Sequence, residues 1–465
     1  MARAISTRLV WLVLPDPLST RIFFDCGIVE QLRARLGERL QVVFLMDRSE
    51  VTGWSDRLAG VPVLYREELF PLRVGIGSTV WRRVDRWLDR QIGFYPLALR
   101  VSLRNGFHRE RMRPGHRNTF LDPTRVGSLP HWVWLERLMQ RWHYSRLRYL
   151  PRTLAGRLRS ERPALVMSNI QMQIDVPLIV AVRRLGLPIV GYVASWDHTV
   201  GKGVIWPGME RYLVQNDVMR DDLARYHSIG PERVVVTGWP QSDVFYRRRP
   251  RSEYERLLRT FGLDPSRPVI LVMGNTPTNA PFEPRFVARL VSWWESGPCE
   301  RFQLLFRPHP RDSEWHERFA AALDREGIHV QEPSYTDIEH LALLLQHGDC
   351  VVSNAGTILL DSLVNDRPAL CVLYDEGAPP GETWAVKNVG GEHYTKLVES
   401  NAFYRAHDFG EVAAGIEQAL AHPEELATER HRVAREVVGE VDGRAAERVV
   451  QAILAGIEGD TVRER

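Results

Sequence analysis

Short, continuously apolar runs alternate along this chain with longer segments of helical periodicity, and the alternation occurs in both halves. Runs such as Val269–Met273 hold no polar residue, which is typical of a parallel strand buried on both faces. Helical segments of about 10 to 15 residues lie between such runs and predict βαβ units and parallel sheets. We expect helices at about 24–36, 175–185, 284–296, 313–326, 337–347 and 357–365. We expect strands at 9–14, 42–45, 61–65, 164–167, 189–193, 211–214 and 234–236, and again at 269–273, 302–306, 328–331, 350–353 and 369–373.

A run of arginines between Tyr246 and Glu253 divides the chain near its middle. This composition is typical of a linker, so we expect an α/β fold of two Rossmann-like domains that face each other across a cleft. Residues 1–245 would form the first domain, with an arginine-rich helical insertion at about 66–160. Residues 246–465 would form the second domain, which ends in a helical tail.

Composition excludes several classes of protein. The chain has 465 residues, of which 44% are hydrophobic and 26% charged, as in ordinary globular proteins. Its four cysteines are far apart and form no CxxC pair, which argues against a disulfide framework or a zinc ribbon and favours a reducing, cytoplasmic location. No apolar run approaches the roughly 18 residues of a membrane span. HExxH and GxGxxG motifs are missing, so we expect no metal and no nicotinamide cofactor.

The segment 100–162 is strongly basic. It holds fifteen arginines against four acidic residues, together with several tryptophans and tyrosines. Interleaved arginine and aromatic side chains suit an anionic lipid surface, and the segment would then hold the protein peripherally on the inner leaflet of the membrane. A solvated helical face whose aromatic residues pack inward explains the same pattern. Both interpretations stay open, and we expect no nucleic-acid partner.

The segment from Ser353 to Asp361 follows an expected buried strand and contains a small, glycine-containing turn before a helix. Amide groups in the first turn of a helix bind anions, and small side chains let a phosphate approach them. An ordinary strand-to-helix turn with a capping hydroxyl is the alternative. The candidates for phosphate binding in this turn are Ser353, Asn354, Ala355, Gly356 and Thr357.

Two further loops follow expected strands of the second half. An R-P-H-P turn begins at Arg307, and its prolines fix the backbone so that His309 projects from a rigid turn. Arginine suits fork-like recognition of phosphate, although an incidental surface turn explains the same residues. The loop after strand 269–273 offers a glycine for close backbone approach and two hydrogen-bonding side chains. Its candidates are Gly274, Asn275 and Thr276.

The loop after strand 189–193 carries the candidates for a general base. Asp197 and His198 lie side by side, and either could take a proton from an attacking hydroxyl. Lys202 is a candidate for binding the acceptor and is notable because lysine occurs only three times in the chain. A turn with a solvent-exposed histidine is the alternative. Two weaker candidates for binding an acceptor follow the first strand, Asp25 and Gly27, which helix capping explains more simply.

Four segments together resemble the CDP-glycerol glycerophosphotransferase family, the teichoic-acid polymerases. Segment 196–202 (W-D-H-T-V-G-K) resembles that family's W-H-G-T-x-x-K loop, and segment 236–244 (V-T-G-W-P-Q-S-D-V) resembles its T-G-x-P-R-x-D stretch. The R-P-H-P turn and the segment 349–361 resemble two further conserved blocks. Order and spacing agree across roughly residues 190–375, whereas the first 160 residues match nothing specific.

The resemblance implies a GT-B fold without a catalytic metal. Its C-terminal domain would bind a nucleotide-activated sugar or glycerol donor, and its N-terminal domain would present a polysaccharide or lipid-linked acceptor. The family's catalytic histidine aligns with Asp197 and its glycine with His198, while its arginine is replaced by Gln241. The donor diphosphate would be held by Arg307, His309, Ser353 and Thr357, with Asp361 as a further donor-site residue.

Three functions are compatible with these features. The favoured one is a metal-independent glycosyltransferase, or a related glycerophosphotransferase, that acts on a hydroxyl of a surface-polysaccharide or lipid-linked acceptor. The second is a nucleotide-sugar 2-epimerase, which shares the architecture but needs several acid/base groups that converge on the sugar. The third is a non-catalytic module of a polysaccharide assembly complex.

Overall fold

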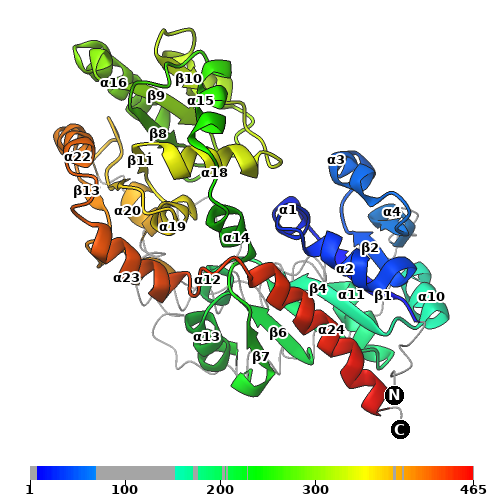
Figure 1. Ribbon diagram of the computed structural model, residues 1–465. Helices are drawn as coiled ribbons and strands as arrows, with labels where there is room; N and C mark the ends of the chain where they lie inside the picture. The colour runs from blue at the N-terminus through cyan, green and yellow to red at the C-terminus, as the bar shows by residue number, and fades with distance from the viewer. Residues whose placement is uncertain are drawn as a thin grey trace. The chain divides into compact units, whose positions relative to one another are not determined.

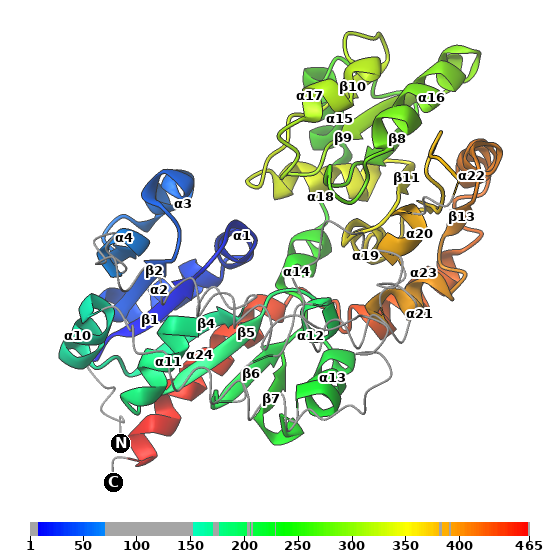
Figure 2. The same ribbon diagram turned by 180° about the vertical axis from the view of Figure 1, so that it is seen from behind.

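The computed structural model describes residues 8–69, 152–170, 176–201, 205, 208–227, 229–380, 384–389 and 392–463. The chain forms two compact units (Figures 1 and 2). Unit 1 comprises residues 1–240 and 444–465, and unit 2 comprises residues 241–443. Each unit is built on its own parallel sheet with helices, so the expected α/β fold with two Rossmann-like domains is confirmed.

The sheet of unit 1 has seven described strands in the order β3-β2-β1-β4-β5-β6-β7, and all neighbouring pairs are parallel. The order changes direction between β1 and β4, as in a doubly wound sheet. Every residue of β1, β2 and β5 is buried, and Gln41 in β2 is the one polar residue among these three strands. The strands are β1 (Val10–Leu14), β2 (Leu40–Phe44), β3 (Val63–Tyr65), β4 (Leu165–Ile170), β5 (Ile189–Val193), β6 (Arg211–Val214) and β7 (Val234–Val236).

The last helix of the chain belongs to unit 1. Helix α24 packs on α2, β4 and β6, and it runs through this unit as the red helix of Figure 1. The expected second domain, 246–465, therefore differs from unit 2 at its tail, because residues 444–465 return to the first sheet. The described helices of unit 1 are α1 (Pro17–Asp25), α2 (Ile28–Leu36), α3 (Thr52–Ser55), α4 (Arg66–Leu69), α10 (Arg152–Glu161), α11 (Val176–Arg184), α12 (His198–Gly201), α13 (Asp217–His227) and α24 (Ala445–Arg463).

The sheet of unit 2 has six described strands in the order β10-β9-β8-β11-β12-β13, again all parallel. Here the order changes direction between β8 and β11. The sequence did not predict β13, a three-residue edge strand with an arginine at its centre. The strands are β8 (Val269–Met273), β9 (Gln303–Arg307), β10 (Ile328–Val330), β11 (Cys350–Ser353), β12 (Ala369–Val372) and β13 (Tyr404–Ala406).

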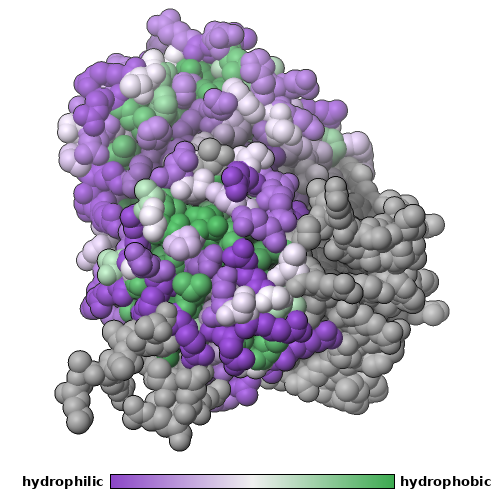
Figure 3. All heavy atoms as spheres, turned by 90° about the vertical axis from the view of Figure 1, so that its right-hand side faces the viewer, coloured by the Kyte–Doolittle hydropathy of each residue, from purple (hydrophilic) through white to green (hydrophobic). Residues whose placement is uncertain are grey.

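The core of unit 2 forms where α16 and α22 cover one face of this sheet. Phe306 of β9, Val352 of β11, Trp294 of α16 and Ile416 of α22 belong to one buried cluster. Hydrophilic side chains cover most of the described surface on the face drawn in Figure 3. The helices of unit 2 are α15 (Arg251–Thr260), α16 (Glu283–Glu295), α17 (Trp315–Arg318), α18 (Ile338–His347), α19 (Ile358–Val364), α20 (Trp384–Val389), α21 (Thr395–Val398), α22 (Phe409–Ala421) and α23 (Ala427–Val437), and α14 (Pro240–Tyr246) contains the division between the units.

Within the described part of the chain, no helix is long and apolar enough to cross a membrane. Most of the arginine-rich segment 100–162 lies outside the described residues, so its two interpretations remain predictions.

Candidate functional site

The change of strand direction in unit 2 brings together two of the candidate loops. In open parallel sheets, ligands bind beyond the carboxyl ends of the strands, at the point where the strand order reverses. That point lies between β8 and β11, which pair in register from Cys350–Ile270 to Ser353–Met273. The loop after β8 and the turn after β11 therefore start side by side.

Close packing explains the glycine that begins the loop after β8. The N–H of Gly274 donates to the carbonyl of Arg307, with an N–O distance of 2.9 Å. A Cβ atom at Gly274 would lie 2.9 Å from the ring of Phe319 and 3.2 Å from Cα of Pro308. A larger residue would thus separate this loop from the turn after β9. Asn275 and Thr276 follow, and the Asn275 side chain accepts the N–H of Thr276 at 2.8 Å.

The turn after β11 is held by hydrogen bonds to neighbouring segments of unit 2. Ser353 is buried, and its hydroxyl donates to the carbonyl of Met273 at 3.1 Å. Gly356 has a φ of +114°, which favours glycine, and its N–H donates to the hydroxyl of Tyr394. Ala355 is buried, whereas Thr357 is exposed at the start of α19. The sequence thus located a tight strand-to-helix turn in which Thr357 is the accessible hydroxyl.

An amide bridge joins the two loops. Asn388, on α20, donates from its side-chain nitrogen to the carbonyl of Asn279 at 2.8 Å and to the side-chain oxygen of Asn354 at 2.7 Å. The Asn354 nitrogen donates to the carbonyls of Val372 and Ala385. Nothing in the sequence singled out Asn388, because its partners lie 34 and 109 residues away.

Arg307 and His309 differ in their surroundings. The guanidinium of Arg307 is mostly buried and donates to the side chains of Gln331 and Asp337, each at 2.6 Å. It is therefore engaged with the segment that follows β10. His309 accepts the N–H of Arg311 on Nδ1 at 3.0 Å, so a neutral ring carries its proton on Nε2.

Asp361 is buried in the first turn of α19. Its carboxylate accepts a hydrogen bond from the side-chain nitrogen of Gln241 at 3.0 Å. Gln241 stands where the resembling family carries arginine, and here it pairs with a residue of the expected donor site within unit 2.

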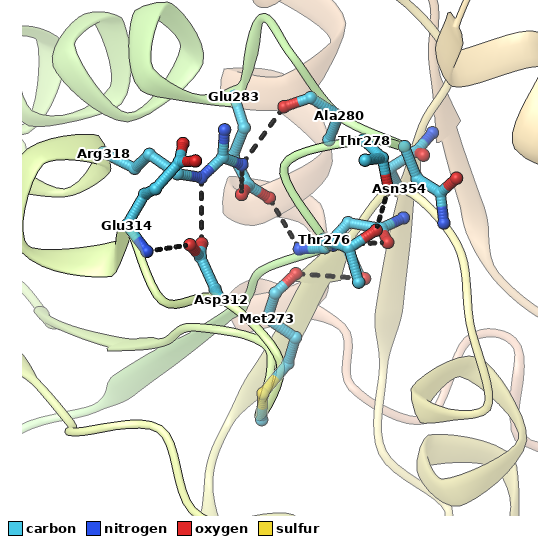
Figure 4. A network of polar contacts seen from close by, with 12 residues as sticks. Met273, Thr276, Thr278, Ala280, Glu283, Asp312, Glu314, Arg318 and Asn354 are labelled. Carbon is cyan, nitrogen blue, oxygen red and sulfur yellow. Dashed lines mark hydrogen bonds and ion pairs between the residues drawn. The ribbon is translucent and has the colours of Figure 1, made fainter. Parts of the chain in front are cut away.

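A buried cluster of charges supports the loop after β8 (Figure 4). Arg318 forms ion pairs with Glu283 at 2.6 Å and with Asp312 at 2.8 Å, and Glu283 accepts the N–H of Asn275 at 2.9 Å. Burial raises the pKa of Glu283 to about 7, against the opposing effect of Arg318. We did not predict this cluster. An arginine directly before the apolar run Phe319–Leu323 is the signal that could have revealed it.

In unit 1, the candidate bases follow β5. Asp197 accepts the hydroxyl of Ser195 at 2.5 Å, and its carboxylate lies 3.9 Å from Nε2 of His198. The Asp197 side chain is 23% exposed and that of His198 only 6%, so Asp197 is the more accessible of the two. The N–H of His198 donates to the carbonyl of Ser195 and closes the turn.

Helix α13 fixes the loop that begins with these residues. His227 is fully buried, and its Nδ1 accepts the N–H of Ile205 at 2.9 Å while its Nε2 lies 2.7 Å from the carbonyl of Thr199. Both contacts are satisfied by a neutral ring protonated on Nε2. The hydroxyl of Thr199 also donates to Asp222 at 2.8 Å. Lys202 lies between these anchors but outside the described residues.

The two candidates after the first strand have structural roles. The carboxylate of Asp25 pairs with Arg57 at 2.7 Å, and burial raises its pKa. Gly27 is the N-cap of α2, with a φ of +77° that favours glycine. The predicted single helix over 24–36 is therefore divided, and Asp25 closes α1.

No group of three or more histidine, cysteine, aspartate or glutamate side chains suited to a metal ion occurs among the described residues.

Two Rossmann-like units with candidate loops at their strand ends are typical of GT-B transferases. The solved structures confirm the fold: a UDP-GlcNAc 2-epimerase from Neisseria meningitidis bound to UDP-GlcNAc has a TM-score of 0.54 at 11% identity and covers 96% of this chain and 99% of its own. The S. aureus MnaA–UDP co-structure gives 0.54 at 12% identity, with 96% of both chains covered. The wall teichoic acid polymerase TagF gives 0.51 at 11% identity, with 98% of this chain and 90% of that chain covered.

The family follows from the sequence. The model of the CDP-Glycerol:Poly(glycerophosphate) glycerophosphotransferase family matches residues 208–455, more than half of the chain, and the chain belongs to this family. It is a GT-B-type transferase of nucleotide-activated donors. No protein of curated function matches it.

Proposed function

We propose that this protein transfers glycerol phosphate from a cytidine-diphosphate-linked donor to a hydroxyl of a surface-polysaccharide or lipid-linked acceptor. The family match carries the proposal, because residues 208–455 span all of unit 2 with its strand-end loops. The segment 196–202, which resembles the family's catalytic loop, precedes the matched residues.

Unit 2 would bind the diphosphate of the donor at the β8–β11 switch point. The position of this point supports the assignment, as do the side chains of Asn275, Thr276 and Thr357 near it. His309 can add a hydrogen bond from Nε2 to a phosphate oxygen, because its Nδ1 is occupied by the N–H of Arg311. In this proposal Arg307 orients the turn after β9 through Asp337 and does not itself need to touch phosphate.

Unit 1 would supply the base. Asp197 takes the proton of the acceptor hydroxyl as that oxygen attacks the phosphorus next to glycerol. A new P–O bond forms to the acceptor, the bond to the α-phosphate oxygen breaks, and cytidine monophosphate leaves. The hydrogen bond from Ser195 and the greater exposure of Asp197 support its choice over His198.

The arginine-rich segment 100–162 would bring the enzyme to the inner face of the membrane, where a lipid-linked acceptor resides. Its fifteen arginines support binding to anionic lipid, and such binding weakens with ionic strength. Sedimentation with phosphatidylglycerol vesicles should recover the protein at low salt and release it at high salt. Equal recovery on phosphatidylcholine vesicles would contradict this part of the proposal.

The experiment that tests the function measures nucleotide release from a panel of donors. CDP-glycerol should yield cytidine monophosphate only when a glycerol-phosphate-primed acceptor is present, and UDP-GlcNAc should remain unchanged. Conversion of UDP-GlcNAc without an acceptor would replace the transferase by an epimerase. Acceptor-dependent release of nucleotide from a nucleotide-sugar, with none from CDP-glycerol, would keep the assignment as a transferase but change the donor.

A further inference from the structure

The buried charge cluster of unit 2 connects two loops that the proposed function assigns to the donor. Arg318, at the end of α17, donates from Nε to Asp312 at 2.8 Å and from Nη2 to Glu283 at 2.6 Å and to the carbonyl of Ala280 at 3.1 Å. Figure 4 shows its guanidinium between these carboxylates. A single side chain therefore contacts both the loop after β8 and the turn after β9.

On the β8 side, the contact continues to the candidate donor residues. Glu283 begins α16 and uses its other oxygen to accept the N–H of Asn275 at 2.9 Å. Arg318 also binds the carbonyl of Ala280, at the other end of the same loop. Within the loop, the N–H groups of Asn279 and Ala280 both donate to the carbonyl of Thr276. The loop is thus held at both ends by one cation and one carboxylate.

On the β9 side, Asp312 carries the contact to the R-P-H-P turn. Its N–H donates to the carbonyl of His309 at 2.8 Å, and its carboxylate also accepts the N–H of Glu314 at 3.1 Å. The side chain of Asp312 has no exposed surface, and that of Arg318 is 7% exposed. Movement of Arg318 would therefore disturb His309 as well as Asn275.

Burial of two carboxylates and one guanidinium in a protein interior is energetically unfavourable. Desolvation of buried ions offsets much of their attraction, and apolar residues of similar volume often give equal stability. Stability alone therefore does not account for the cluster. Its contacts end on backbone groups of two candidate donor loops, which suggests that it fixes their relative position.

We propose that Arg318 is a positioning residue that holds the loop 274–280 and the turn 308–312 as one rigid, phosphate-facing unit. The inference rests on the proposed function for the identity of the ligand, but the coupling of the two segments can be measured without any ligand. Preorganised loops bind more tightly because less ordering is needed on binding.

The test compares Arg318→Met with Arg430→Met. Arg430 is also a buried arginine of unit 2, and it pairs with Asp366 at 2.7 Å. Asp366 follows the C-terminal end of α19, whereas the 353–357 turn precedes the N-terminal end of that helix. Arg318→Met loses two buried ion pairs and Arg430→Met loses one, to a carboxylate that is 34% exposed, so the free energy of unfolding of both variants is measured alongside. Affinity for CDP is measured by calorimetry, and amide exchange of 274–280 and 308–312 by mass spectrometry without nucleotide.

We expect Arg318→Met to weaken CDP binding about tenfold and Arg430→Met less than twofold. Exchange should quicken in both segments together in Arg318→Met and in neither in Arg430→Met, while Arg318→Lys should fall between wild type and Arg318→Met. Equal losses of affinity in the two methionine variants, or faster exchange in only one segment, would overturn the inference. If wild type binds neither CDP nor UDP, the proposed function fails and the exchange result alone decides whether Arg318 couples the segments.

Discussion

The loop after β5 in unit 1 and the loops after β8 and β9 in unit 2 are held by different chemistry. In unit 1, one helix holds the base loop through the neutral ring of His227 and the carboxylate of Asp222. In unit 2, a buried guanidinium and two carboxylates tie the loops of two strands together. The comparison suggests that the base loop depends on a few hydrogen bonds to a single helix, whereas the donor loops depend on a buried charged network that responds to pH.

The largest expected effect separates catalysis from binding. Asp197→Asn should lower the rate of transfer by roughly 10²–10⁴-fold, because the amide cannot take the proton of the acceptor hydroxyl. Affinity for CDP should stay unchanged, since the donor loops belong to unit 2. Asp217→Asn, a highly exposed carboxylate on α13, is the control and should keep full activity. Normal turnover of Asp197→Asn would show that another residue is the general base.

The contacts of His227 can be broken and then restored. His227→Leu should lower kcat on the order of 10–100-fold, because the loop that begins with Asp197 loses its anchors at Thr199 and Ile205. His227→Gln can still accept from Ile205 and donate to Thr199, so it should recover most of kcat. Steady-state kinetics on both variants provide the measurement. Equal loss in both would show that the two hydrogen bonds do not position the loop.

Glu283 makes the stability of the donor unit depend on pH. Its pKa is raised to about 7 from an ordinary value near 4.5, chiefly by burial, with Arg318 opposing and Asp312 adding to the shift. Between these two pH values the folded state binds a proton on Glu283 that the unfolded state does not. The contribution of this protonation to the free energy of unfolding is complete below pH 4.5 and is lost as pH rises through 7. Relative to Glu283→Gln, wild type should lose roughly 1–3 kcal/mol of unfolding free energy between these values. The free energy of unfolding of both proteins is measured by urea denaturation at each pH. A difference between them that does not change with pH would contradict this prediction.

Gly274 tests how closely the two donor loops must pack. Gly274→Ala places a methyl group against Phe319 and Pro308 and should cost roughly 1–3 kcal/mol of unfolding free energy. Gly156→Ala is the control, because Gly156 lies in α10 with no neighbour within 4 Å of the added atom. That substitution should stabilise the protein by about 0.5–1 kcal/mol. Urea denaturation measures the free energy of unfolding of both variants. An unchanged value for Gly274→Ala would show that the loops can move apart.

The sequence predicted the sheets better than the loops between them. Runs such as Val269–Met273 are buried on both faces, so their hydrophobicity alone predicts a strand. Strand β13 was not predicted because its sequence, Tyr-Arg-Ala, lacks the apolar run by which the buried strands were recognised. The predicted helix over 313–326 contains only the short α-helix α17 and a 3-10 turn at Ala320–Ala322, and Arg318 at the end of α17 points inward to its carboxylate partners.

The candidate site shows the same limit. Strand ends are local features, so the loops with Gly274, Arg307, Ser353 and Asp197 could be found from sequence. Which side chains stay accessible depends on partners far along the chain. Arg307 meets Asp337 thirty residues later, and this pairing had no local signal.

Hydrogen exchange of the wild-type protein with and without CDP tests the central claim most directly. The account predicts that CDP slows exchange in the segments 274–280, 308–312 and 353–357 of unit 2. Protection confined to other segments of the chain would contradict the assignment of the donor diphosphate to the switch point between β8 and β11.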